Sequence, residues 1–144
     1  MANSVVTAAI TVVTGTLVFT LGHFLVKMVV EPIHELSRLR GKIAEDLIFY
    51  SNLIGNAGSD SIKTEQFTEA ENTLREDASL LTAKMHMIPW YQLWNVFGLV
   101  PECSNIETAH GDLIFLSNRL ANGDPSETSE KRKEIRDALD LRHD

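Results

Sequence analysis

The sequence predicts an all-α protein, with one N-terminal transmembrane helix followed by a small cytoplasmic antiparallel helical bundle. Three observations lead to this prediction. The N-terminal part is apolar and almost uncharged, and apolar residues recur at three- and four-residue steps in three later segments. Glycine and proline gather in short stretches between those segments. The expected organisation is a transmembrane helix over residues 4–30, a bundle over 31–123, and a short charged helix or tail over 124–144.

The transmembrane prediction depends on the apolar run near the N-terminus. Residues Val5–Gly22 include no charged side chain, and the run continues to Val30, interrupted only by His23 and Lys27. About twenty apolar residues suffice to cross the hydrocarbon core as a helix, and a lysine near the end can reach the headgroups. A cleavable signal peptide is not expected, because no lysine or arginine precedes the run.

The charges that flank the run predict its orientation. Only the α-amino group lies on the N-terminal side, whereas Lys27, Arg38, Arg40 and Lys42 follow on the other side. Because positive flanks stay in the cytoplasm, the N-terminus is expected outside and the C-terminal domain inside. The single cysteine, Cys103, allows no internal disulfide and fits a reducing compartment.

Small residues gather on one side of the predicted transmembrane helix. At about 100° per residue, five of them fall within about 60° of each other. They are Ser4, Ala8, Thr11, Gly15 and Gly22. Small residues let helices approach closely in lipid. Two interpretations stay open: a helix-packing face for self-association or for another membrane protein, and an alignment by chance.

Three amphipathic helices are expected after the membrane segment, at about Pro32–Leu53, Thr64–His86 and Ser104–Gly123. Their apolar stripes are Ile33, Leu36, Leu39, Ile43, Leu47, Tyr50 and Ile54; Phe67, Ala70, Leu74, Ala78, Leu81 and Met85; and Ile106, Ala109, Leu113, Leu116 and Leu120. The charged residues of the second helix, Asp77 among them, are expected on its solvent-facing side. Such helices are unstable alone and must pack together.

Local sequence signals predict where some of these helices start and end. Pro32 suits either a first helical turn or a kink in a longer helix, and both alternatives stay open. The glycine-rich run 55–60 is expected to end the first amphipathic helix. Ser104 and Glu107 have the spacing of a capping box at the start of the third.

The C-terminal segment is expected to form a short, charged helix. Asn122–Gly123 ends the preceding helix, with Gly123 as a left-handed cap, and Asp124–Pro125 opens the last one. Ile135 and Leu139 are its only firm apolar contacts.

An aromatic segment, residues 88–100, lies between two prolines and is expected to form one or two short helical turns. Its large side chains are Trp90, Tyr91, Trp94 and Phe97. One interpretation places them in the core, where two helices turn. The other makes them an anchor for the membrane interface or for a partner protein, because tryptophan and tyrosine are favoured in both settings.

Three stretches resemble a known group of proteins. EPIHELSRLRGKIAEDLIFYSN, IPWYQLW and IETAHGDLIFLSNRL are similar to segments of short bacterial single-pass inner-membrane proteins of unknown function. The resemblance covers most of the chain after the membrane helix. It implies the same topology and a place in the bacterial inner (plasma) membrane, and it carries no activity and no site residues.

Two Glu-x-x-His pairs, Glu31–His34 and Glu107–His110, have the spacing of ligands in di-iron bundles. Helical geometry points Glu31, His34 and Glu107 well away from their stripes and puts His110 at the edge of one. Cys103 and His110 would lie about 10 Å apart along a helix, too far for a nucleophile and its base. No catalytic residue, metal ligand or cofactor is therefore expected.

The formal net charge is −7, and Lys27 is the only charged side chain before Glu31. An acidic domain disfavours a nucleic-acid partner. The leading hypothesis is a membrane-anchored interaction or scaffold protein, not an enzyme. Its partners would be the lipid bilayer and either further copies or another membrane protein. One alternative is an enzyme or metal-binding helical bundle. The other is a homo-oligomeric membrane pore or exclusion factor. A pore would need a polar face on the transmembrane helix, for which Thr7, Thr11 and Thr14 are the weak indication.

Overall fold

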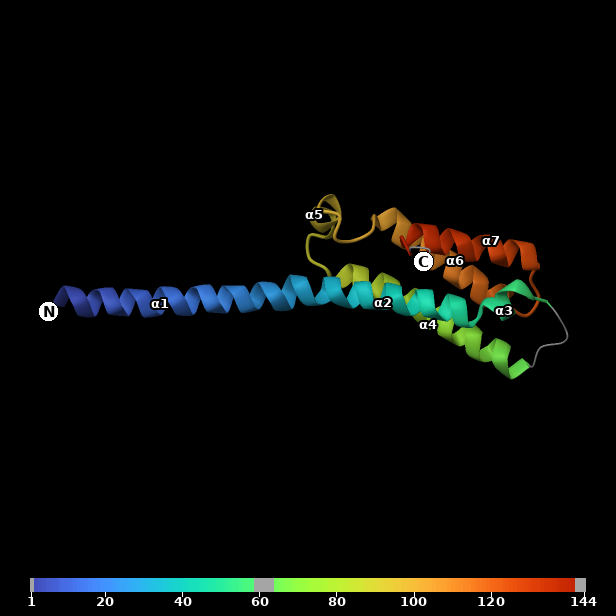
Figure 1. The fold of residues 1–144 in the computed structure, drawn as a ribbon, viewed down its shortest axis with the longest axis horizontal. Coiled ribbons are helices and arrows are strands. Elements are labelled where there is room, and N and C mark those ends of the chain that lie inside the picture. Colours follow the sequence, from blue (N-terminus) through green and yellow to red (C-terminus); the bar gives the residue numbers. More distant parts are fainter. Residues whose placement is uncertain (1, 59–63, 142–144) are drawn as a thin grey trace.

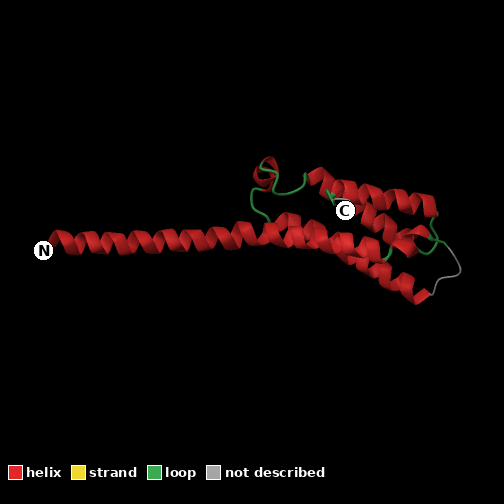
Figure 2. Ribbon diagram, in the orientation of Figure 1, coloured by secondary structure: helices red, strands yellow, loops and turns green. Residues whose placement is uncertain are grey.

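The computed structural model describes residues 2–58 and 64–141, and within these ranges the chain forms helices and turns but no strand (Figure 2). The elements are α1 (Ala2–Leu25), the π-helical turn η1 (Val26–Val30), α2 (Glu31–Phe49), α3 (Ser51–Gly55), α4 (Thr64–Met87), α5 (Tyr91–Val96), α6 (Cys103–Arg119) and α7 (Pro125–Ala138). The all-α prediction is confirmed.

Helix α1 extends alone, and the other helices form one domain at its end (Figure 1). Successive long helices α2, α4, α6 and α7 alternate in direction, so that each returns alongside the one before it. Helix α4 packs against α2 and α6, while α7 packs against α6 and the short helix α3. This helical domain, α2 to α7, has a single apolar core.

The predicted apolar stripes form the core of the helical domain. Every stripe residue is buried except Ile33, which packs against the core and is half-buried. The last helix and its C-cap also contribute, because Ile135 on α7 and Leu139 directly after it are fully buried. The three-and-four spacing of apolar residues therefore identified the buried face of each long helix correctly.

Helix α7 has polar contacts to the other helices beyond its two apolar residues. Thr128 is buried, and its hydroxyl donates to the carbonyl oxygen of Ile54 at 2.6 Å. Arg40 on α2 donates from Nε to the carbonyl oxygen of Leu139 at 2.9 Å. A cation at the last carbonyl of a helix is favourable, because the helix dipole is negative there.

Helices α1 and α2 form one continuous helix from Ser4 to Phe49. A proline ring inside an α-helix collides with the carbonyl four residues earlier and removes one hydrogen bond. Just before Pro32 the helix widens into the π-helical turn η1, where the amide of Glu31 donates to the carbonyl oxygen of Val26. This wider turn accommodates the ring, so Pro32 does not separate two helices.

The start of α6 differs from the prediction. The helix begins at Cys103 after an extended N-cap, Glu102, and no side chain caps it. Ser104 lies inside the first turn, where its carbonyl oxygen accepts from the hydroxyl of Thr108 at 2.9 Å. The predicted Ser104–Glu107 capping box is therefore wrong, because Glu102 occupies the N-cap position and Ser104 already lies within the helix.

The role predicted for Gly123 is also wrong. Helix α6 ends at Arg119, and the glycines with positive φ in the described ranges are Gly58 (φ 73°) and Gly98 (φ 70°). Glycine is required at position 123 for a steric reason instead. A Cβ added there would collide with the carbonyl oxygen of Arg119 and lie 2.9 Å from that residue's Cβ. The helix predicted to run to about Leu53 ends earlier, because α2 stops at Phe49 and the short helix α3 follows. Gly55, the first residue of the run predicted to end that helix, is the last residue of α3, and residues 59 and 60 lie outside the described residues.

Candidate functional site

The exposed apolar surface of α1 is the first functional feature. All side chains from Ser4 to Met28 are exposed, and the helix is long and apolar enough, by length and composition, to cross a membrane. The hydroxyls of Thr11, Thr16 and Thr20 donate to carbonyl oxygens of their own helix at 2.8–2.9 Å. Their polar groups therefore have partners without water.

The five small residues of the predicted packing face, Ser4, Ala8, Thr11, Gly15 and Gly22, all lie on this exposed helix. A shallow groove is lined by Ser4, Thr7, Ala8, Thr11 and Val12. A Cβ added at Gly15 or at Gly22 would meet no described atom within 4 Å. Nothing within the described part of the chain thus requires glycine at these two positions.

The second feature is the aromatic lobe, which we define as residues 87–100, between α4 and α6. It contains the short helix α5 and stands out from the domain beside the end of α1 (Figure 1). A left-handed glycine, Gly98, closes the helix. The amide of Leu99 donates to the carbonyl oxygen of Trp94 at 3.0 Å, and that of Gly98 donates to Asn95 at 2.8 Å. This is the Schellman arrangement, which gives α5 a defined end.

The inner side of the lobe packs on the domain. Tyr91 is buried, and its hydroxyl donates to the carbonyl oxygen of Pro101 at 2.8 Å. Burial raises the pKa of Tyr91 to about 12, so the hydroxyl stays protonated. Trp94 is half-buried and donates from Nε1 to the carbonyl oxygen of Pro89 at 3.0 Å. The Tyr91 hydrogen bond therefore joins the lobe to the segment just before α6, whereas the Trp94 hydrogen bond stabilises the turn within the lobe.

The outer side of the lobe is apolar and uncovered. Trp90 is 72% exposed, Val96 82% and Phe97 66%. Met87, Leu93 and Leu99 are also exposed. The four aromatic residues singled out in the sequence thus divide: Tyr91 and Trp94 point inward, whereas Trp90 and Phe97 face outward.

Trp90 has an unusual backbone conformation. Its φ of 53° and ψ of 42° place it in the left-handed region, which costs a bulky residue about 1–2 kcal/mol relative to glycine. The packing of an exposed ring does little to offset this cost. A strained residue that the core does not use is a candidate for a contact outside the domain.

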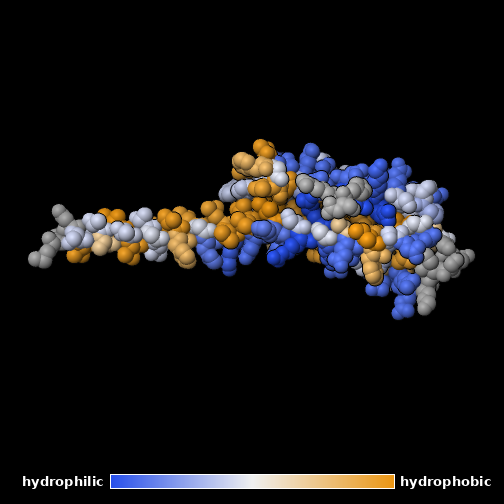
Figure 3. Space-filling view, in the orientation of Figure 1, coloured by the Kyte–Doolittle hydropathy of each residue, from blue (hydrophilic) through white to orange (hydrophobic). Residues whose placement is uncertain are grey.

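The lobe and the continuous helix enclose a crevice of about 370 Å³. Val29, Val30 and Ile33 line it from the helix, and Trp94 and Leu99 line it from the lobe. Figure 3 shows the result on the surface: apolar colour runs from the helix onto the lobe, while the rest of this face of the domain is mostly hydrophilic.

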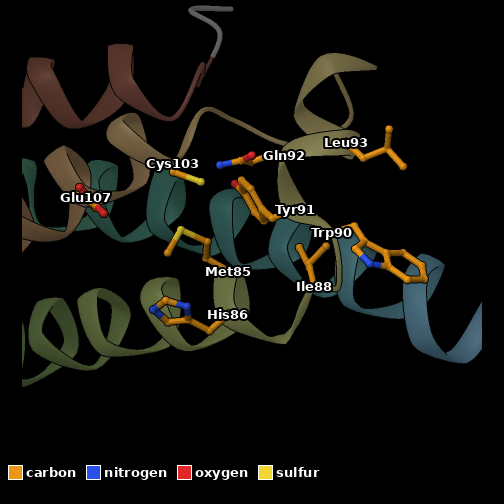
Figure 4. Close-up of a pocket in the computed structure, with 9 residues that line it drawn as sticks. All are labelled: Met85, His86, Ile88, Trp90, Tyr91, Gln92, Leu93, Cys103 and Glu107. Carbon is orange, nitrogen blue, oxygen red and sulfur yellow. The ribbon is translucent and has the colours of Figure 1, made fainter.

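A second, open cavity of about 650 Å³ lies between the end of α4, the lobe and the start of α6 (Figure 4). Tyr91 points toward Met85 and Cys103, while Trp90 and Leu93 extend to the opposite side. His86 and Glu107 also line this cavity.

The two Glu-x-x-His pairs do not come together around a common centre. Glu31 and His34 line a surface crevice at the start of α2. His110 faces α4, with Nδ1 at 2.9 Å from the carbonyl oxygen of Ala78 and 3.1 Å from Oγ1 of Thr82. Within residues 2–58 and 64–141, no three His, Cys, Asp or Glu side chains form a group that could hold a metal ion.

The placement of Asp77 on the solvent-facing side of its helix is wrong, because this residue has 0% exposure. Its Oδ1 accepts from Nζ of Lys42 at 2.6 Å, and Lys42 also donates to Asp46 at 2.8 Å. Burial raises the pKa of Asp77 to about 6, against the effect of Lys42. Burial lowers the pKa of Lys42, but hydrogen bonds and charges from Asp46 and Asp77 raise it more.

A second buried carboxylate, Asp112 on α6, pairs with Lys131 on α7 at 3.1 Å. Burial raises its pKa, although Lys131 acts in the other direction. Among the described residues, Oδ2 of Asp77 and Oδ2 of Asp112 have no hydrogen-bond partner. The signal that the sequence analysis missed was spacing. Each aspartate lies three residues after one stripe residue, Leu74 or Ala109, and four residues before another, Leu81 or Leu116.

Comparisons of the chain with protein-family models, with curated proteins and with solved structures gave no match.

Proposed function

We propose that this protein is a membrane-anchored interaction or scaffold protein. Helix α1 would cross the bacterial inner membrane once, with the N-terminus outside and the helical domain in the cytoplasm. The observation that supports this most is the exposed, uncharged surface of α1, which no part of the described domain covers. Such a surface is costly in water and favourable in lipid. The proposal assigns no catalytic activity, no cofactor and no nucleic-acid partner.

The orientation follows from the positive residues at the domain end of α1. Lys27 lies in η1, and Arg38, Arg40 and Lys42 follow on α2 within the next four turns. Positive charges this close to the end of a span favour the cytoplasmic side.

The single cysteine, Cys103, provides a direct test of this topology. In intact spheroplasts, a membrane-impermeant maleimide is expected to leave Cys103 unlabelled, and permeabilisation should expose it to the reagent. The same reagent should label a cysteine added before Met1 in a Cys103→Ser background without permeabilisation. The opposite pattern would reverse the orientation, and recovery of the chain in the soluble fraction would reject membrane anchoring.

The small-residue face supports assembly as part of the function. Because a Cβ added at Gly15 meets no described atom within 4 Å, and the neighbouring side chains of α1 are exposed, we expect Gly15→Leu to act on contacts with another helix. We expect it to weaken self-association roughly tenfold, or about 1–2 kcal/mol, in native mass spectrometry of gently extracted protein. Val13→Leu, on the opposite side of the helix, is the control. If both variants self-associated equally strongly, the small-residue face would not be the contact between helices.

A further inference from the structure

We propose that the aromatic lobe docks onto the headgroup region of the same bilayer that α1 crosses, so that the helical domain meets the membrane at a second point. The occupant of this apolar surface is thus a lipid surface. This inference depends on the proposed anchoring of α1 and adds a separate contact to it.

The position of the lobe along the helix supports this contact. An α-helix rises 1.5 Å per residue, so Val5–Phe24 spans about 30 Å, the thickness of the hydrocarbon core. Residues Val26–Val30 then lie in the headgroup layer. Because Trp94 and Leu99 share a crevice with Val29, Val30 and Ile33, the lobe stands beside the helix at this level.

The composition of the lobe matches that environment. Residues 87–100 include no Asp, Glu, Lys or Arg, in a chain of which 23% of the residues are charged. Its exposed apolar side chains are Met87, Trp90, Leu93, Val96, Phe97 and Leu99, and Gln92, polar but uncharged, is exposed as well. Tryptophan and other apolar groups favour the boundary between acyl chains and headgroups, and the uncharged surface avoids the cost of bringing a charge there.

The backbone of Trp90 gives an independent argument. Its left-handed conformation is strained for a bulky residue, and it holds the ring outside the core. Within the domain this arrangement leaves a large apolar ring in water. A lipid contact gives the ring an apolar environment, and the favourable free energy of this contact offsets the cost of the strained backbone.

The test uses the intrinsic fluorescence of the full chain, because its two tryptophans both lie in the lobe. Trp94→Phe leaves Trp90 as the only reporter. This variant is reconstituted into phosphatidylcholine–phosphatidylglycerol vesicles that contain lipids brominated near the headgroup end of the acyl chain. We expect a blue-shifted emission, strong quenching by these lipids, weaker quenching by bromines near the chain end, and several-fold protection from aqueous iodide.

The matched control lies at the far end of α2, where Phe49 is 74% exposed. In a background with Trp90→Phe and Trp94→Phe, Phe49→Trp is expected to remain accessible to iodide and unaffected by brominated lipid. Docking is overturned if Trp90 behaves like this distal reporter in protein that still floats with vesicles after an alkaline wash. It is also overturned if Trp90 is shielded from both iodide and bromine, which would indicate a second protein chain as the cover. Protein that fails to float would reject the anchoring itself, and the docking with it.

Discussion

Replacing Lys42 with methionine is expected to lower the free energy of unfolding by about 3 kcal/mol at pH 7. Removal of one partner from a buried ion pair leaves an uncompensated charge and costs about 3–5 kcal/mol. We expect the lower end of this range because the Lys42 side chain is 46% exposed, whereas Asp77 has no exposure. Chemical denaturation of the full chain in mild detergent, followed by far-ultraviolet circular dichroism, measures the change.

The pH dependence of this loss separates it from a simple packing defect. The pKa of Asp77 is raised to about 6 in the folded protein, so the folded state binds a proton more readily than the unfolded chain. Stability from this group is therefore present at low pH and is lost as pH rises through about 6. Without Lys42 the carboxyl should protonate at still higher pH. The deficit of Lys42→Met should accordingly shrink between pH 7 and pH 5.

Two further variants make the result decisive. Lys84→Met removes a pair with Glu35, a side chain that is 44% exposed, and should cost less than about 1 kcal/mol. Adding Asp77→Asn to Lys42→Met should restore most of the lost stability, because no buried charge remains. Equal losses at Lys42 and Lys84, or a deficit that does not depend on pH, would contradict the assignment.

Gly123→Ala is expected to destabilise the helical domain by about 1–3 kcal/mol, the usual cost of forcing atoms into a filled site. The new Cβ would meet the backbone of Arg119, and the carbonyl oxygen of Gly123 lies so close to Gly58 that a Cβ at Gly58 would be 2.7 Å away. Neither backbone segment can move alone, because the amide of Gly58 donates to the carbonyl oxygen of Leu120 at 3.2 Å. Thermal denaturation compared with the parent chain gives the size of the effect.

The control for this substitution comes from α6, the helix that precedes Gly123. Gly111 lies on the exposed side of α6, and an added Cβ would meet no described atom within 4 Å. Gly111→Ala should therefore stabilise the domain by about 0.5–1 kcal/mol, because alanine favours a helix interior more than glycine does. If both variants moved stability in the same direction, the space requirement at Gly123 would be wrong.

The sequence predicted the long helices and their buried stripes well, since many residues contribute to each periodic pattern. It failed where the outcome depends on a single residue. Asp77 and Asp112 have core spacing but a charged side chain, and only the partner on another helix makes their burial possible. The position of Gly123 likewise depends on how the α6–α7 turn meets the end of α3. The short α5 has too few residues for a period, so the division between Tyr91 and Trp90 emerges only from the folded turn.

The uninterrupted helix from α1 into α2 has a mechanical consequence. No loop or turn interrupts the helix between α1 and the domain, because η1 accommodates Pro32 within the helix. The 19 residues of α2 extend about 28 Å from Glu31. A change of about 10° in the tilt of α1 would therefore swing the far end of α2 by about 5 Å, carrying α4, α6 and α7 with it. If α1 crosses a membrane as proposed, membrane thickness and neighbouring helices, which set the tilt of a span, would therefore also set the orientation of the helical domain.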